Sequence, residues 1–148
     1  MKLLDDVKRA KRVYICGNGG SAANAIHMAN DLILCGIKAH ALVADVSTLT
    51  AIANDFGYEH VFSRQLRVFG EPGDLLIAMS GSGNSPNILE ALKVAKEIGV
   101  KSWALVGMTG GKARELADEV MYYAEGMQAA EERQLLVAHG LMKELSGR

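Results

Sequence analysis

Short, wholly apolar runs alternate along this chain with longer stretches whose apolar residues recur at helical spacing. Strands are expected at residues 13–16, 39–43, 75–79, 103–106 and 120–123. Helices are expected at 2–10, 21–34, 49–54, 61–69 and 86–98, with a short one before the fifth strand and an amphipathic one over about 130–145. Strands without a polar face are typical of a parallel sheet buried on both sides. The pattern therefore predicts an α/β fold, a three-layer αβα sandwich around a five-stranded parallel sheet.

Length and composition narrow the function classes. A chain of 148 residues is expected to form a single domain, residues 1–148. Its net charge of −1 and lack of a basic block disfavour direct contact with nucleic acid. Without a signal-peptide pattern or an apolar stretch of bilayer length, we expect a cytoplasmic protein with no membrane partner. Cys16 and Cys35 lack metal-binding spacing, and Cys16 is expected to be a buried apolar residue.

Two glycine- and serine-rich loops, 17–21 and 80–85, each follow a predicted strand and open a predicted helix. Such a turn directs backbone N–H groups and a helix N-terminus at one place, which favours an anion. In parallel sheets, ligands bind at the carboxyl ends of strands, where both loops lie. Dinucleotide-binding spacing and a Walker lysine are both missing. The loops predict a neutral, hydroxyl-lined cradle for a phosphorylated small molecule, although Ser21 and Ser85 could also be simple helix N-caps.

Histidine and acidic residues on two predicted helices are candidate metal ligands or acid–base groups. His27 and Asp31 are four residues apart, so they project from one helix face as two ligands of one metal do. The alternative is a solvent-facing ion pair. His139 lies in an apolar stretch of the last helix and could instead be a hydrogen-bonded core residue. Glu131 and Glu132 precede it by about two turns, and helix periodicity alone favours Glu132 as its neighbour.

Three segments of the chain are distinctive when taken together: C-G-N-G-G-S-A-A-x-A-x-H at 16–27, L-T-A-I-A-N-D-F-G-Y-E-x-V-F-S-R-Q at 49–65 and S-G-S-G-N-S-P-N-I-L at 80–89. Together they resemble the sugar isomerase (SIS) domain in its phosphoheptose isomerase branch. The similarity extends over nearly all of residues 12–145. It implies a flavodoxin-like or Rossmann-like fold. It also implies an aldose–ketose isomerase that converts sedoheptulose 7-phosphate to D-glycero-D-manno-heptose 7-phosphate.

The resemblance implies roles for individual residues as well. Phosphate binding is expected at Ser80, Gly81, Ser82 and Ser85. Sugar binding is expected at Gly17, Asn18, Gly19, Ser21, Asp31, Asn54, Asp55 and Glu131, although Asn54 and Asp55 could simply end a helix. Zinc, or another divalent metal, is expected on His27, Asp31, Glu131 and His139. Asp31 is then the catalytic base and His139 the acid of a proton transfer through an enediolate.

Two of these residues depart from the family pattern. Asp31 stands where the family has glutamate, which shortens the reach of the base by one methylene group, and Glu131 stands where it has glutamine. The N-terminal helical region is also shorter than in the family. The family's homotetramer, with active sites between subunits, implies a homo-oligomer here. Two other functions stay open: a non-catalytic SIS adaptor or phosphosugar sensor, such as a replication-initiator-binding protein, and an isomerase of another sugar phosphate.

Overall fold

A five-stranded, all-parallel sheet forms the centre of the computed structural model, which describes residues 1–147. The strands are β1 (Val13–Cys16), β2 (Ala39–Ala41), β3 (Leu75–Ser80), β4 (Lys101–Val106) and β5 (Glu119–Tyr122), and their spatial order is β2-β1-β3-β4-β5. In the central pair, Ile15 of β1 lies opposite Ile77 of β3. The predicted fold class and all five strands are confirmed. The second strand is shorter than expected, because the N–H of Ala44 donates back to the carbonyl of Ala41 and closes a turn there.

Helices connect the strands in the order that the periodicity predicts. They are α1 (Lys2–Arg9), α2 (Gly20–Leu34), α3 (Val46–Phe56), the 3-10 turn η1 (Tyr58–His60), α4 (Ser63–Phe69), α5 (Pro86–Ile98), α6 (Ala113–Leu116) and α7 (Met127–Ser146). Helix α3 begins earlier than predicted because the Asp45 side chain caps it, accepting from the N–H and the hydroxyl of Thr48. None of these helices, within residues 1–147, is both long and apolar enough to cross a membrane.

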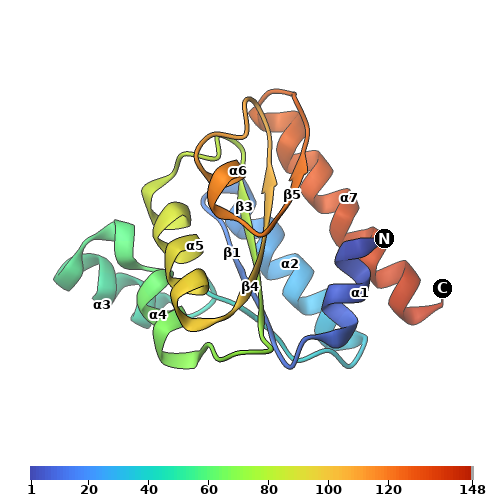
Figure 1. The fold of residues 1–148 in the computed structure, drawn as a ribbon, viewed down its shortest axis with the longest axis horizontal. Helices are drawn as coiled ribbons and strands as arrows, with labels where there is room; N and C mark the ends of the chain where they lie inside the picture. The colour runs from blue at the N-terminus through green and yellow to red at the C-terminus, as the bar shows by residue number, and fades with distance from the viewer. Residues whose placement is uncertain (148) are drawn as a thin grey trace.

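The sheet is buried on both faces, as its apolar strands require. Figure 1 shows α1 and α7 on one side of the sheet and α4 and α5 on the other. Successive residues of β1 alternate between the two cores: Ile15 packs with α1, α2 and α7, whereas Tyr14 and Cys16 pack with α4 and α5. Because α2 and α7 also pack against each other, side chains from these two distant segments can form one site.

Helix α3 is the exception to this layered packing. It projects away from the sheet (Figure 1), and no residue of this described helix is buried. Its last turn leads through Gly57 into η1, which packs against α5. The segment 46–60 is therefore an arm that contacts the core through the partly buried Leu49, Ile52 and Ala53 and through the packing of η1 on α5.

Candidate active site

The two glycine–serine loops meet at the carboxyl ends of β1 and β3, which are neighbouring strands. From these ends, the chain turns into α2 on one face of the sheet and into α5 on the other. This is the topological switch point, where open parallel sheets bind their ligands. A small cavity of about 70 Å³ lies there, lined by Asn18, Ser21, Met79, Ser80, Gly81, Ser82, Ser85 and Met127. The structure thus brings both predicted loops to one cavity.

The hydroxyl groups of the second loop are set to donate hydrogen bonds. The Oγ of Ser80 accepts from the N–H of Gly83 at 3.0 Å, and the Oγ of Ser82 accepts from the N–H of Asn84 at 3.1 Å. Because these contacts use oxygen lone pairs, each O–H stays available to an anion in the cavity. Ser85 directly precedes α5 but makes no side-chain capping bond within the described chain. The cradle is therefore more than a pair of helix caps.

Cys16 ends β1 directly before the first loop and is fully buried. Burial raises the pKa of its thiol far above the ordinary range. Its side chain packs in the core against α4 and α5, so Cys16 is not a nucleophile of this site. This agrees with the sequence-based expectation.

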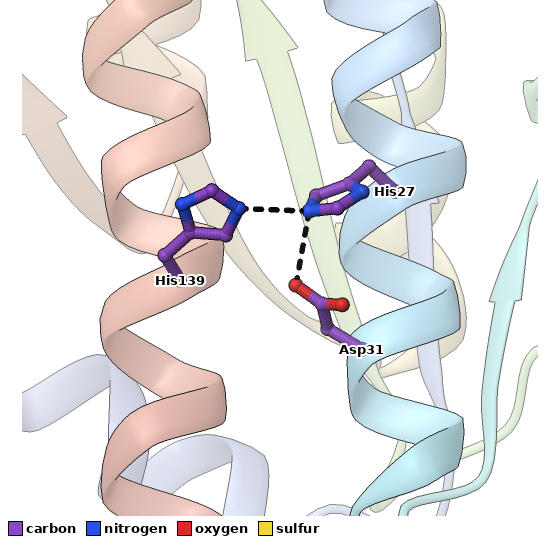
Figure 2. A group of neighbouring side chains, drawn as sticks. All are labelled: His27, Asp31 and His139. Carbon is purple, nitrogen blue, oxygen red and sulfur yellow. Dashed lines mark hydrogen bonds and ion pairs between the residues drawn. The ribbon is translucent and has the colours of Figure 1, made fainter. Parts of the chain in front are cut away.

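His27, Asp31 and His139 form a compact group between α2 and α7, as Figure 2 shows. The Nε2 atoms of His27 and His139 are 3.0 Å apart, and Asp31 Oδ2 is 3.2 Å from His27 Nε2. Asp31 is 4% exposed, whereas His139 is exposed. Asp31 and His27 are therefore not the solvent-facing pair that the sequence left open, and His139 is not a core residue.

The chemistry of this group fits a bound metal ion. One nitrogen or oxygen atom from each residue lies within 4.8 Å of the others. Two ligands of a tetrahedral zinc ion are about 3.4 Å apart, close to the two distances above. Asp31 Oδ2 is buried and accepts no hydrogen bond among the described residues, with His27 Nε2 as its ion-pair neighbour at 3.2 Å, an arrangement that a bound cation would stabilise. Imidazole and carboxylate donors suit zinc and also harder divalent ions.

Glu131 lies near the first loop rather than in this group. Its carboxylate packs over Gly20, where a Cβ would overlap it, and its backbone carbonyl accepts from Asn24 Nδ2 at 2.9 Å. Glu132, which helix periodicity favoured, is exposed and accepts from Gln128 Nε2 at 3.2 Å. Glu131 rather than Glu132 lies near the site because α7 packs on α2 through the face that carries Glu131. The periodicity of α7 alone cannot show which of its faces meets α2.

Gln134 is a site-supporting residue that the sequence analysis missed. Its Oε1 accepts from Ser21 Oγ at 2.9 Å and from Asn24 Nδ2 at 3.1 Å, which joins α7 to the first turn of α2. It is 2% exposed, and its Nε2 has no partner within residues 1–147. The sequence does contain a sign of its role, because Gln134 is a polar residue on the helix face that Ala130 and Val137 make apolar in α7.

Asn54 and Asp55 lie at the end of α3 and are exposed. Asn54 Nδ2 donates to Asp55 Oδ1 at 3.0 Å. Neither residue lines the cavity between the two loops. Within one chain, the structure therefore does not bring this pair to the other predicted site residues.

Known proteins with similar sequences and structures identify the family of this chain. The sequence pattern of the SIS domain matches residues 2–107. The chain belongs to the SIS domain family. It is also 41% identical over 145 residues to the phosphoheptose isomerase of Paramagnetospirillum magneticum, covering 93% of this chain and 76% of that protein, which places it in the phosphoheptose isomerase branch.

Two further relatives show how much of each protein is similar to this chain. The phosphoheptose isomerase of Akkermansia muciniphila is 47% identical over 120 residues, which cover 77% of this chain and 64% of that protein. The solved phosphoheptose isomerase structure from Neisseria gonorrhoeae superposes with a TM-score of 0.91 at 37% identity, covering 99% of this chain and 82% of that one. The SIS chain thus spans 64% of the length of the first of these relatives.

Proposed function

We propose that this SIS chain is an aldose–ketose isomerase that converts sedoheptulose 7-phosphate to D-glycero-D-manno-heptose 7-phosphate. The observation that carries the proposal is that a cavity suited to phosphate lies beside the first turn of α2, near an acid–base group that α2 and α7 form together. His27 follows Ser21 by six residues of α2, about 9 Å along the helix axis. A phosphorylated sugar can therefore reach from the cradle to His27, Asp31 and His139. The names of the relatives, phosphoheptose isomerases, support a phosphorylated heptose as the substrate class.

The phosphate would bind to the second loop. Ser80, Ser82 and Ser85 offer hydroxyl donors, and the N-terminus of α5 adds its backbone N–H groups and dipole. Binding energy gained there, away from the reacting carbons, holds C1 and C2 in place for proton transfer.

Asp31 would act as the base and His139 as the acid. The Asp31 carboxylate takes a proton from C1 of the ketose, which leaves an enediolate, and returns a proton to C2 to give the aldose. His139 moves protons between the two sugar oxygens, for which its exposed ring is accessible. His27 holds the Asp31 carboxylate in position from one turn away. Since aspartate is short, the sugar must approach α2 closely.

A divalent metal, most simply zinc, belongs to the proposal. His27, Asp31 and His139 would hold it, and Glu131 would join them as a fourth ligand only by turning away from Gly20. A bound divalent ion supplies Lewis-acid polarisation of the sugar carbonyl.

A homo-oligomer is also proposed. Helix α3 leaves Val46 69% and Phe56 50% exposed, and a second copy that covered this arm would bury them. In such an assembly, with sites between subunits, Asn54 and Asp55 would contribute to the neighbouring cavity.

Asp31→Asn tests the mechanism. Asparagine keeps the shape but cannot accept the C1 proton, so turnover of sedoheptulose 7-phosphate should fall at least about 100-fold, whereas inorganic phosphate should bind as in the wild type. Aldoheptose phosphate is followed by NMR with added zinc and with chelator. Asp5→Asn, an exposed change on α1, is the matched control. Full turnover in Asp31→Asn would refute the assignment of the base, and phosphosugar binding without turnover by the wild type would favour a sensor.

A further inference from the structure

Asn18 is the first-loop residue that faces both the cavity and two distant parts of the chain. We infer that Asn87 and Tyr58 are positioning residues that orient the Asn18 amide so that it offers the sugar an N–H donor and no acceptor. This inference rests on the proposed function, because it takes the ligand of the cavity to be a phosphorylated sugar. Neither Asn87 nor Tyr58 lines the cavity, so both would act through Asn18.

The side-chain amides of Asn18 and Asn87 form a reciprocal pair. Asn18 Nδ2 donates to Asn87 Oδ1, and Asn87 Nδ2 donates to Asn18 Oδ1, both at 2.8 Å. Asn87 is 1% exposed on the first turn of α5. The pair thus ties the loop after β1 to the helix after β3 across the switch point. It sets the spacing between the sugar-binding loop and the phosphate-binding loop.

A reciprocal amide pair is satisfied equally well if both amides turn over together, because each still donates once and accepts once. The pair alone therefore does not decide whether Asn18 presents its nitrogen or its oxygen to the cavity. Tyr58 supplies the missing asymmetry. Its hydroxyl donates to Asn18 Oδ1 at 2.8 Å. A phenol hydroxyl can also accept, but conjugation with the ring makes its oxygen a weaker acceptor than an amide carbonyl oxygen, so the orientation that places Asn18 Oδ1 toward Tyr58 is favoured.

Tyr58 reaches Asn18 because of the backbone of the arm. Gly57 has φ +103°, in the region that favours glycine, and this turn directs η1 back toward the first loop. No side chain of α3, all of whose residues the structure describes, is buried. The Tyr58 hydroxyl is thus a contact by which the arm influences the cavity.

The consequence for the ligand follows from counting donors and acceptors. Asn18 Oδ1 accepts two hydrogen bonds, from Tyr58 and Asn87, so both of its lone pairs are used. Asn18 Nδ2 uses one of its two N–H groups for Asn87. The second N–H remains for a ligand oxygen that can accept, such as a sugar hydroxyl or carbonyl. Without Tyr58, the Asn18 amide would adopt both orientations, and only the one that turns its N–H toward the cavity can donate to the ligand oxygen.

Tyr58→Phe is the direct test, since Tyr58 is 53% exposed and phenylalanine keeps its ring while removing the hydroxyl. Without Tyr58, the two orientations of the amide are equally populated, so the competent population is halved and the apparent Kd should rise about twofold. Calorimetry with the zinc-loaded protein should show this rise for sedoheptulose 7-phosphate and an unchanged Kd for inorganic phosphate. Tyr14→Phe, which loses a hydroxyl bond to the Phe69 carbonyl at the other end of β1, is the control and should match the wild type.

A double-mutant cycle separates positioning from mere structural support. If Tyr58 acts through Asn18, Tyr58→Phe should not weaken sugar-phosphate binding further in an Asn18→Ala background. An equal loss in both backgrounds, or no loss in the wild-type background, would overturn the inference while leaving the proposed function intact. Failure of the wild type to bind sedoheptulose 7-phosphate would instead overturn the proposed function and the inference with it.

Discussion

Replacing Gly83 with alanine tests whether the phosphate cradle depends on close packing between two loops. Gly83 has φ +69° and lies in the serine loop. A Cβ there would lie 2.5 Å from the carbonyl carbon of Gly110 and 3.0 Å from the amide nitrogen of Gly111, whereas ordinary contact begins at 3.4 Å. These are backbone atoms and cannot swing aside as a side chain would. The two loops must therefore separate.

The expected loss of stability has two parts. Alanine in the left-handed region costs about 1–2 kcal/mol, and reduced freedom of the unfolded chain offsets about 0.4–1 kcal/mol of it. Forcing the loops apart adds about 1–3 kcal/mol, as overpacking does elsewhere. We therefore expect Gly83→Ala to lower the free energy of unfolding by about 2–4 kcal/mol.

The same displacement should weaken anion binding. The N–H of Gly83 donates to Ser80 Oγ, and its carbonyl accepts from the N–H of Ala113, so moving Gly83 also moves Ser80, which we propose binds phosphate. Loss of one hydrogen bond to a charged group is worth about 1.5–3 kcal/mol. The Kd for inorganic phosphate should rise about tenfold or more.

Urea unfolding followed by circular dichroism measures the first effect, and calorimetry with inorganic phosphate measures the second. Gly36→Ala is the matched control, because Gly36 has φ +81° but no described atom lies within 4 Å of the place that its Cβ would take. It should lose only about 1 kcal/mol and keep its phosphate affinity. Equal losses of stability in the two variants, together with an unchanged phosphate Kd in Gly83→Ala, would refute the packing argument.

Two other predictions concern the core. Burial raises the pKa of Asp6, but hydrogen bonds from Lys101 and Trp103 outweigh it and hold the pKa below its ordinary value of 3.8. This stabilisation is complete above that value and is lost as the pH falls through the folded-state pKa. Asp6→Asn should thus lose about 1–3 kcal/mol at pH 7 and flatten the acid limb of a stability–pH curve; an unchanged limb would contradict this. Iodoacetamide should label the partly exposed Cys35 but not Cys16 in the native protein; rapid labelling of Cys16, detected by mass spectrometry, would contradict its burial.

Local sequence was enough to predict the elements and the two loops that line one cavity. Helix α5 was predicted to the residue, because Pro86 starts it and Gly99, at φ +77°, ends it. The two glycine–serine loops were recognisable for the same reason: the conformation of a turn depends on the residues within it and directly beside it.

Which side chains meet depends instead on the packing of distant segments. Ser21 and Gln134 are 113 residues apart, and His27 and His139 are 112 apart. Their contacts depend on how α7 packs on α2, so periodicity within α7 favoured Glu132 over Glu131 without information about the neighbouring helix. The orientation of Asn18 likewise depends on partners 69 and 40 residues away. The local sequence pattern shows which face of a helix or strand is apolar and which is polar, whereas the packing of the layers determines which faces of different elements meet in one site.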